Sequence, residues 1–449
     1  MSLEPLHRSA RCAGFALLLS VSPSVLAQPS ALSAANPEVE ALCAAVDPRV
    51  IDWRRDIHRY PELSNREVRT AAKVADHLRG LGIEVTTGVA HTGVVGLLRG
   101  GRPVPVVALR ADMDALPVTE RVDLPFASRE TATYGGQTVG VMHACGHDAH
   151  VAILMGVAEV LAGVRDELPG TVKLIFQPAE EGAPEGEEGG AEMMVAEGVL
   201  ADPAVDAIFG LHVGADLDVG TIWTRPGGLM ASADDFRIVV HGKQTHGSRP
   251  WSGIDPIVTS AMIVTGLQTI VSRQMPLTES AAVVTVGSIQ GGVRSNIIPE
   301  RVEMVGTVRA FDEEVRATIH DRVRRMATTI AESMGARAVV TIPLTTAYPV
   351  TTNDPELLAR MMPSLEAVAG PGNVRTSNPI TGAEDFSFFA RQVPGLFFFL
   401  GVKPPDVAAE DAAPHHTPDF FVDESGLPLG VRALVRLTLD YLESGAATR

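Results

Sequence analysis

An apolar run that ends in carboxylates decides the fold: residues 104–117 are VPVVALRADMDALP. Val104–Leu109 is rich in valine, which favours a buried β-strand. Asp112 and Asp114 follow it, and because alternate residues of a strand face the same side, their carboxylates point together. Such a pair either binds a metal directly or orients a metal-bound imidazole.

The same arrangement recurs twice further along the chain. Val172–Phe176 and Ala207–Leu211 are short β-rich runs, and each ends in a polar cluster. The stretch His150–Val164 predicts a helix between the strand at Val104–Leu109 and the one at Val172–Phe176. Strands that alternate with helices predict an α/β layer with a mostly parallel sheet. Since ligands bind at the carboxyl ends of such strands, we expect the polar clusters to meet there.

The pattern changes near residue 225. Before it, residues 47–80 carry apolar positions at helical spacing and end at Gly80, where a strand follows. After it, the chain predicts the order β-α-β-β-α-β, a ferredoxin-like unit, at Asp235–His241, Asp255–Arg273, Ala281–Gln290, Arg301–Ala310, Glu313–Met334 and Ala336–Ile342. Helix and strand signals then return at Pro355–Ala369 and Gly395–Gly401. We therefore predict an α/β catalytic domain, residues 28–225 and 344–449, interrupted by a smaller ferredoxin-like domain, residues 226–343.

The first 27 residues have the pattern of a signal peptide. Basic residues precede a short apolar run, Ala13–Val21, and small residues follow at Val25–Ala27. The run is too short to cross a bilayer, and no later segment of the sequence is long enough. We therefore expect an exported protein, periplasmic or secreted. Removal of residues 1–27 leaves only Cys43 and Cys145, too few for a disulfide scaffold, and the sequence assigns no role to Cys43.

Length and charge narrow the class of protein. A chain of 449 residues is long enough for two or three domains. Hydrophobic residues make up 45% and charged residues 20%, which are ordinary values for a soluble globular protein. Acidic residues number 54 against 37 basic ones, and this balance argues against nucleic-acid binding. Acidic side chains do suit a cleft that holds cations.

The densest cluster of metal-binding side chains lies between Met142 and His150. It contains one thiol, Cys145, and the imidazoles of His143, His147 and His150. Thiolate and imidazole are ligands for zinc and related ions, and the spacing lets Cys145 and His147 bind one centre. His143 and His150 are either further ligands or residues that are packed or hydrogen-bonded behind the site.

Two more clusters complete a site. Glu180 and Glu181 are adjacent in an extended loop, so their carboxylates face opposite sides. One can bind a metal while the other takes the proton of a water whose pKa the metal lowers to ~7. His212 follows the strand Ala207–Leu211 as a third ligand, and either His415 or His416 completes the set.

At this point the motifs resemble, in family order, the aminoacylase/carboxypeptidase metallopeptidases (peptidase family M20). The most similar branch is its amidohydrolases, which include hippurate hydrolases and plant auxin–amino-acid conjugate hydrolases. The resemblance runs from about residue 48 to 440. Its motifs are Asp112-Met-Asp114-Ala-Leu-Pro117, His143-Ala-Cys145-Gly-His147-Asp148, Glu180-Glu181-Gly182, Gly210-Leu-His212 and Gly382-Ala-Glu384-Asp385-Phe386.

The resemblance implies two divalent metal ions (zinc, manganese or cobalt) and a general base, Glu180. The implied ligands are Cys145, His147, Glu181, His212 and His416. His416 is preferred to His415 because the family ligand stands immediately before a small residue and a proline, here Thr417-Pro418.

The resemblance also implies that the inserted domain is a lid that binds substrate and often forms a homodimer. His246 resembles the lid histidine that completes the oxyanion site, and Asn296 and Arg309 stand where related enzymes bind the substrate carboxylate. The lid departs from its relatives around His246, where Trp251 follows the proline, and at Arg294. These changes concern the substrate pocket rather than the catalytic groups.

Together these features predict metal-dependent hydrolysis of the amide bond of a small molecule, an N-acyl amino acid or a related conjugate. One alternative is a carboxypeptidase or dipeptidase of the same family, which accepts a free amino group. A second is an exported metal- or ligand-binding protein without turnover, although Glu180 would then have no use beside a full ligand set. A third is nucleophilic catalysis by Cys145.

Overall fold

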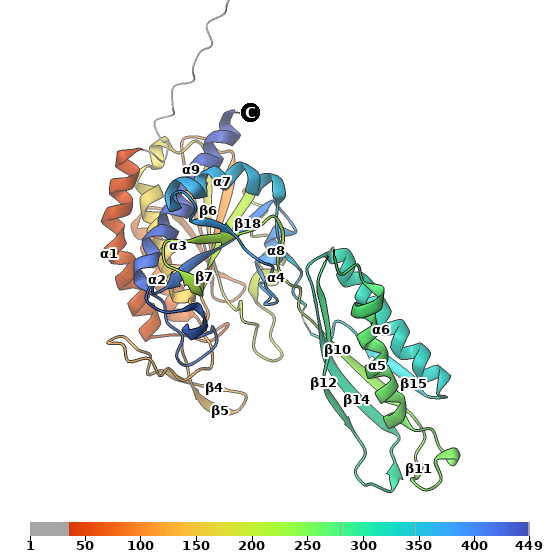
Figure 1. The fold of residues 1–449 in the computed structure, drawn as a ribbon. Coiled ribbons are helices and arrows are strands. Elements are labelled where there is room, and N and C mark those ends of the chain that lie inside the picture. The colour runs from red at the N-terminus through yellow and green to blue at the C-terminus, as the bar shows by residue number, and fades with distance from the viewer. Residues whose placement is uncertain (1–35, 279, 346, 448–449) are drawn as a thin grey trace, which may run out of the picture.

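The computed structural model describes residues 36–447 except 279 and 346, and it has two bodies (Figure 1). The predicted signal peptide, residues 1–27, lies outside the described residues. The larger body contains the eight-stranded sheet, and the smaller one, β10 (Asp234–His241) to β15 (Arg337–Thr341), projects from it. No helix among the described residues is long and apolar enough to span a membrane.

The large sheet has a parallel centre. The strands β6, β3, β7 and β18 lie side by side and run parallel, whereas β1 with β2, β2 with β6 and β18 with β8 pair antiparallel. The parallel centre brings the carboxyl ends of its strands to one edge, as predicted. In spatial order the strands are β1 (Glu84–Val89), β2 (Gly93–Arg99), β6 (Thr171–Gln177), β3 (Val106–Asp112), β7 (Ala207–Asp218), β18 (Gly395–Lys403), β8 (Ile222–Thr224) and β17 (Val374–Thr376).

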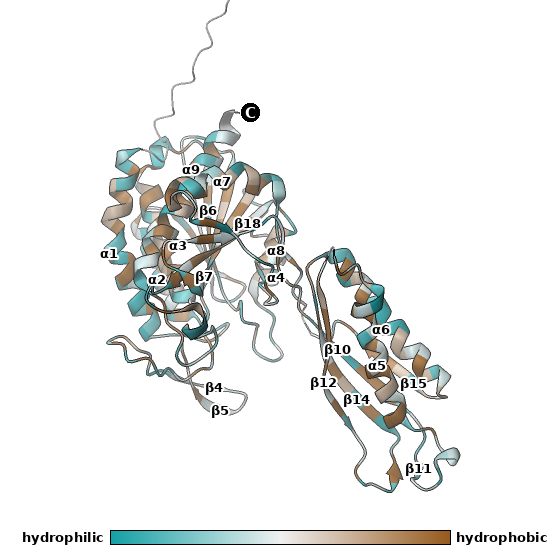
Figure 2. Cartoon of the chain, viewed as in Figure 1, coloured by the Kyte–Doolittle hydropathy of each residue, from teal (hydrophilic) through white to brown (hydrophobic). Residues whose placement is uncertain are grey.

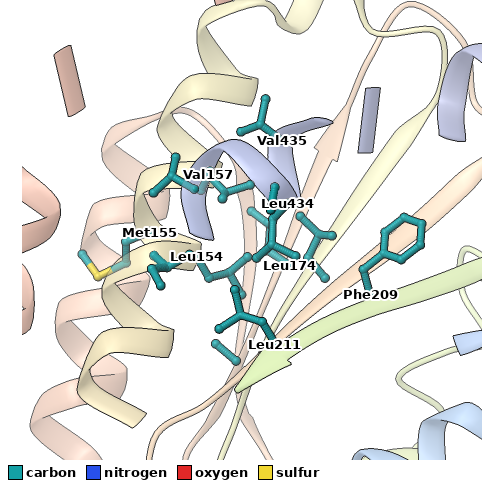
Figure 3. Close-up of a cluster of buried hydrophobic side chains, with 14 of the residues drawn as sticks. Leu154, Met155, Val157, Leu174, Phe209, Leu211, Leu434 and Val435 are labelled. Atoms are coloured by element: carbon teal, nitrogen blue, oxygen red, sulfur yellow. The ribbon is translucent and has the colours of Figure 1, made fainter. Parts of the chain in front are cut away.

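Helices bury one face of this sheet in the main core. Figure 3 shows Leu154 and Val157 of α3 (His147–Gly163) and Leu434 of α9 (Leu427–Ala447) packed toward Leu174 of β6 and Leu211 of β7. The helix α3 is buried on almost every side because α1 (Pro37–Arg59) and α9 contact it from outside. The opposite face is covered by α4 (Gly190–Ala196) and α8 (Phe386–Ala390), and α7 (Pro355–Ala369) packs on α9.

The predicted helical stretch at residues 47–80 is two helices rather than one. The helix α1 ends at Arg59 and α2 (Val68–Gly80) begins nine residues later. Pro61 explains the break, since a proline ring disfavours helical backbone in the residue before it, and Tyr60 has left the helical region at φ −127°. The prediction of one helical stretch rested on the spacing of its apolar residues alone, which does not show this break.

The smaller body is the predicted ferredoxin-like unit, which confirms the fold class. Its elements follow in the order β10, α5 (Pro256–Gln274), β12 (Ala282–Gly291), β14 (Arg301–Ala310), α6 (Glu313–Ser333) and β15. The sheet order is β12-β14-β10-β15, all antiparallel. Figure 2 shows apolar residues along the strands of both bodies, and the two helices bury their apolar stripes against this smaller sheet. The body has its own core, separate from that of the larger one.

Leu174→Ala is expected to destabilise the catalytic domain by about 2–5 kcal/mol, because the truncated side chain lies fully buried between β6 and the helices. Urea unfolding followed by circular dichroism measures this loss. Val68→Ala on the exposed side of α2 is the control and should change the free energy of unfolding by no more than ~0.5 kcal/mol. Equal effects of the two changes would contradict the assignment of this core.

Candidate metal centre

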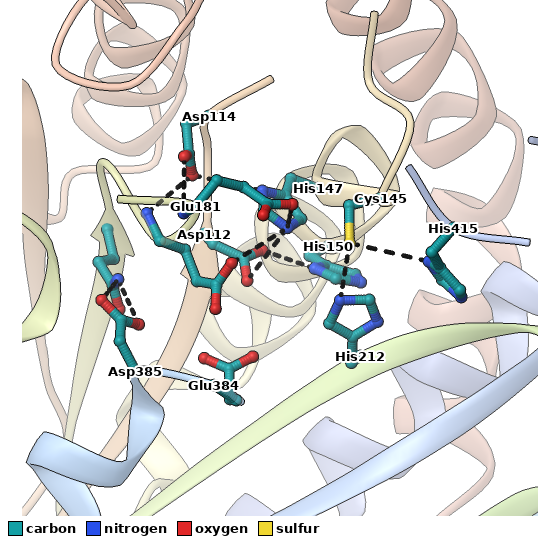
Figure 4. A network of polar contacts seen from close by, with 12 residues as sticks. Asp112, Asp114, Cys145, His147, His150, Glu181, His212, Glu384, Asp385 and His415 are labelled. Atoms are coloured by element: carbon teal, nitrogen blue, oxygen red, sulfur yellow. Dashed lines mark hydrogen bonds and ion pairs between the residues drawn. The ribbon is translucent and has the colours of Figure 1, made fainter. Parts of the chain in front are cut away.

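The site begins in the turn that leads into α3. Cys145 and His147 flank Gly146, which has φ +100° and directly precedes the helix. A Cβ added at Gly146 would lie 2.3 Å from Cγ2 of Val213, so only glycine fits. The turn therefore holds the thiol and the first imidazole on the same side, over the carboxyl edge of the sheet (Figure 4).

Cys145 is the meeting point of residues from three parts of the chain. Its Sγ lies 3.3 Å from Nε2 of His212, 3.3 Å from Nε2 of His416 and 3.7 Å from Nδ1 of His415. His212 lies within β7 rather than at its end, because this strand continues to Asp218, beyond the predicted Leu211. Nδ1 of His212 is 2.7 Å from the carbonyl of Val213 and donates to it, so Nε2 presents its lone pair to the thiol.

His147 provides the test of whether a metal fits. Its Nδ1 lies 3.3 Å from Oδ1 of Asp114, and its Nε2 faces Glu180 at 3.9 Å and Glu181 at 4.0 Å. This Nε2 is buried and has no hydrogen-bond partner among the described residues. Potential ligand atoms of Cys145, His147 and Glu181 all lie within 4.8 Å of one another. A buried imidazole lone pair that faces a thiol and two carboxylates is an arrangement that a divalent cation satisfies.

The two aspartates of the opening motif act from behind this cluster. Asp114 accepts hydrogen bonds from the backbone N–H groups of Glu180 and Glu181, both at 3.0 Å, and from Ser64. Its carboxylate thereby fixes the loop of both glutamates and the ring of His147. Of the two sequence-based alternatives for this residue, direct binding or orientation, the geometry favours orientation.

His150 and His143 are not equivalent. His150 uses both ring nitrogens, since Nδ1 lies 2.6 Å from Asp112 and Nε2 accepts the N–H of Val213 at 2.9 Å. It therefore belongs to the support of the site. His143 is fully buried with no hydrogen-bond partner among the described residues for either nitrogen, and burial lowers its pKa to about 3. It packs 6.4 Å from the ring of His58 and is a neutral buried residue.

The geometry distinguishes His415 from His416. Nε2 of His415 accepts the N–H of Ala215 at 3.2 Å, so its ring proton sits on Nδ1, directed at the thiol of Cys145. Nε2 of His416 lies 3.3 Å from that thiol and 3.0 Å from Oε1 of Glu181. His416 has φ +64°, an uncommon conformation for a non-glycine residue that brings its ring into the cluster. The position of His416 suits the predicted ligand, and that of His415 suits a donor to the thiol.

Arg110 is a central residue to which the sequence assigned no role. Its guanidinium is fully buried and donates to Asp112, Glu384, Asp385 and Gln177 at 2.7–2.9 Å. Both acidic residues of the Gly382–Phe386 motif are therefore brought to the site by this one cation. A buried arginine next to a strand-end carboxylate was the available sequence signal, in the letters RAD of the first motif.

Negative charge around Glu180 exceeds what Arg110 supplies. Carboxylate oxygens of Glu180, Glu384 and Asp385 lie within 4.8 Å of one another. Burial, followed by the charges of Glu384 and Glu181, raises the pKa of Glu180 well above its usual value. Burial, followed by the charges of Glu181 and Glu180, raises the pKa of the Cys145 thiol well above its usual value, which argues against its use as a nucleophile. Bound cations would offset the excess negative charge.

The lid residues are divided between two places. His246 lies in β11 (Thr245–His246), which pairs with β13 (Ile297–Ile298) at the end of the lid that points away from the catalytic domain (Figure 1). Asn296 is beside it and accepts the N–H of Gly247 at 2.8 Å. Arg309 lies at the opposite end, where it lines a cavity of about 830 Å³ together with Glu181 and Asp385. The structure thus brings Arg309 to the site and leaves His246 and Asn296 far from it.

The model of one protein family covers most of the chain: Peptidase family M20/M25/M40 matches residues 108–440. The chain belongs to this family. The M20 resemblance seen in the motifs is thereby confirmed.

Relatives of known name cover nearly the whole chain. It is 42% identical to thermostable carboxypeptidase 1 of Saccharolobus solfataricus over 88% of this chain and 96% of the relative. It is 39% identical to N-acetylcysteine deacetylase of Bacillus subtilis over 89% of this chain and 98% of the relative. A crystal structure of a dinuclear metal-binding M20 peptidase from Bacillus subtilis superposes with a TM-score of 0.73 at 37% identity, covering 89% of this chain and 99% of that one.

These findings confirm the predicted class of activity. The protein is a metal-dependent hydrolase that cleaves amide bonds, and its site is built for two divalent metal ions. Cys145 belongs to two groups of potential ligand atoms, one with His147 and Glu181 and one with His212 and His415. In the second group His416, whose Nε2 lies 3.3 Å from the same thiol, takes the ligand position, because His415 presents a ring N–H to the thiol. A shared thiol between two such groups is what a dinuclear site needs.

His416→Ala is expected to lower the bound metal below two ions per chain, because the imidazole nearest to both Cys145 and Glu181 is lost. His415→Gln is the matched control and should keep both ions, since Nε2 of His415 is already used by the backbone of Ala215. Plasma emission spectrometry of the purified, metal-loaded variants measures the ratio. Loss of metal in the His415 variant alone would contradict the assignment.

Proposed function

We propose that this M20 hydrolase cleaves N-acyl amino acids or related amide conjugates. Cys145, His147, Glu181, His212 and His416 hold the two ions, which are zinc, manganese or cobalt. The observation that carries the proposal is the position of Glu180, buried and 3.9 Å from His147 beside a full set of ligands. When bound, the ions polarise the scissile carbonyl and lower the pKa of water.

Glu180 is the general base and then the general acid. Glu180 lies on the same loop as the proposed ligand Glu181 but is not itself a ligand. Its carboxylate therefore remains available to the attacking water. It takes the proton of this water and passes it to the leaving amine. The raised pKa of Glu180, caused by burial and then by Glu384, favours proton uptake. Tyr348 supports the loop by donating to the carbonyl of Glu180 at 2.7 Å.

The lid supplies the remaining contacts in this proposal. Arg309 and Asn296 bind the carboxylate of the substrate, and His246 stabilises the oxyanion. Because His246 and Asn296 both lie at the far end of the lid, opposite Arg309, they reach a metal centre either by rotation of the lid or from a second copy of the chain.

We propose that the lid forms a homodimer. The strand β12 pairs on one side only, with β14, and is an edge of the lid sheet. Val283 and Ile289 on this strand are 40% and 51% exposed. An exposed apolar edge strand is a surface that pairs readily with another strand.

We further propose that the protein is exported, to the periplasm or the medium. The basic residues, short apolar run and small residues within positions 1–27 support this location. Among the described residues the two cysteines, Cys43 and Cys145, are both free.

The second candidate function is that of a carboxypeptidase on peptides with a free amino group. The 42% identity to thermostable carboxypeptidase 1 favours it. Paired substrates decide between the two: the N-acetyl and N-octanoyl derivatives of leucine and methionine against the dipeptides alanyl-leucine and alanyl-methionine, each before and after chelation. Turnover of the dipeptides alone would reject the N-acyl amino acid proposal.

Glu180→Gln is expected to reduce kcat by about 10²-fold or more, as for other lost general bases, while the metal content stays at the wild-type value. The amide keeps the shape of the side chain but cannot take up a proton. An amide-hydrolysis assay measures turnover, and plasma emission spectrometry on the same sample measures the metal content. Turnover near the wild-type rate would reject Glu180 as the base.

Ile289→Lys is expected to shift the protein from two chains toward one, because it places a charge on the exposed edge of β12. Light scattering after gel filtration measures the mass. Val68→Lys, on α2 of the catalytic domain, is the control and should leave the mass unchanged. A wild-type protein with the mass of one chain would refute dimerisation through the lid.

A further inference from the structure

A second cavity opens beside the metal centre, on the side away from Arg309. It has a volume of about 1040 Å³ and lies within the catalytic domain. The lining of this cavity includes four of the proposed metal ligands, Cys145, Glu181, His212 and His416. A molecule in the cavity therefore reaches the metal centre.

The wall of this cavity is apolar and begins next to a predicted ligand. The ring of Phe399 is 6.1 Å from the ring of His212. Trp223 contributes an indole whose N–H is already donated to Thr221 at 3.0 Å, so the ring offers the cavity only apolar surface. Leu217, Met230 and Ile380 extend the wall outward.

The charges on the cavity decide which part of a substrate it admits. None of the described residues that line it is a lysine or arginine, and the exposed carboxylates of Asp216 and Glu410 are among them. The neighbouring cation of Arg375 lies 5.3 Å over the Trp223 ring and is not itself part of the lining. A substrate carboxylate would therefore be repelled there. Arg309 lies in the other cavity, and the two cavities share Glu181 and Tyr348 as common walls. The two ends of the substrate are thus separated by the metal centre.

We infer that the apolar cavity takes the acyl group of the substrate, and that this group is bulky and apolar rather than acetyl. The inference rests on the proposed function, since it assumes that an N-acyl amino acid lies across the metals. The amino-acid carboxylate then points toward Arg309, and the acyl chain lies along Phe399, Trp223 and Ile380. An acetyl group would leave most of a cavity of about 1040 Å³ to water and gain little from this wall.

Ile380 is the residue best suited to a test. Its side chain is 38% exposed toward the cavity, while its backbone is held by Leu229 and Ala231 at 2.9 Å each. A change of its side chain should therefore alter the wall without unfolding the loop. Val68 is exposed on the outer surface of the same domain and provides a control for an added charge.

The experiment measures kcat/KM of the metal-loaded protein on N-acetyl, N-butanoyl and N-octanoyl derivatives of glycine, L-leucine and L-glutamate. We expect kcat/KM to rise with acyl length by about fourfold for each methylene that becomes buried, mainly through a lower KM. Ile380→Asp should reduce the octanoyl-to-acetyl ratio by tenfold or more, whereas Val68→Asp should keep the wild-type ratio. Ile380→Thr, which keeps the β-branch but removes Cδ1 and adds a hydroxyl, takes its place if the aspartate variant fails to fold.

The outcomes separate the two proposals. If the acetyl derivatives are hydrolysed as well as the octanoyl ones, or if both charge variants keep the wild-type ratio, the acyl-cavity inference is overturned and the proposed function stands. If none of the nine amides is hydrolysed by protein that holds two ions per chain, the proposed function fails and the inference fails with it. A ratio that rises with length and falls only in the Ile380 variants supports both.

Discussion

The metal centre depends on one buried cation of the protein itself. Arg110 stands on β3 with no contact to solvent and holds Asp112, Glu384 and Asp385, which come from distant parts of the chain. Without this guanidinium, several carboxylates at the edge of a hydrophobic sheet would repel one another and pay the full cost of burial. With it, Asp112 can hold His150, and Glu384 can stay close to Glu180. The arginine thus allows a strongly acidic site within a well-packed core.

Much of this architecture could be predicted from the sequence because its elements obey local rules. The strands of the parallel centre are apolar runs of β-branched and aromatic residues, and the lid follows the β-α-β-β-α-β order with clear turns between elements. The metal cluster was found because Cys145 and His147 stand close in sequence, Glu181 follows the strand β6, and His212 lies in the strand β7. The predicted ends of two elements were wrong. Apolar residues keep helical spacing past Pro61, although the helix ends before this proline. The strand β7 continues past His212 because it pairs with β18 there.

Other features depend on the packing of remote segments and have no local signature. Residue types alone left His415 and His416 open, and only the family resemblance preferred His416; the physical reason, the Ala215 N–H that occupies Nε2 of His415, depends on the fold. It likewise could not place His246, which stands in a recognisable motif but is carried by the lid far from the metal centre. The apolar wall is built by Trp223 of β8, Phe399 of β18 and Ile380 of the loop between β17 and α8, which come together only in the fold.

The turn at Gly146 also couples the metals to the main core. Cys145 and His147 precede and begin α3, and α3 is the helix that the sheet, α1 and α9 enclose. Ions that bind the folded turn but not the unfolded chain lower the free energy of this whole layer by thermodynamic linkage, to an extent set by their concentration relative to the dissociation constant. The lid has a separate core and lies outside this linkage. Metal supply would therefore govern how long the catalytic domain, but not the lid, survives in a dilute environment.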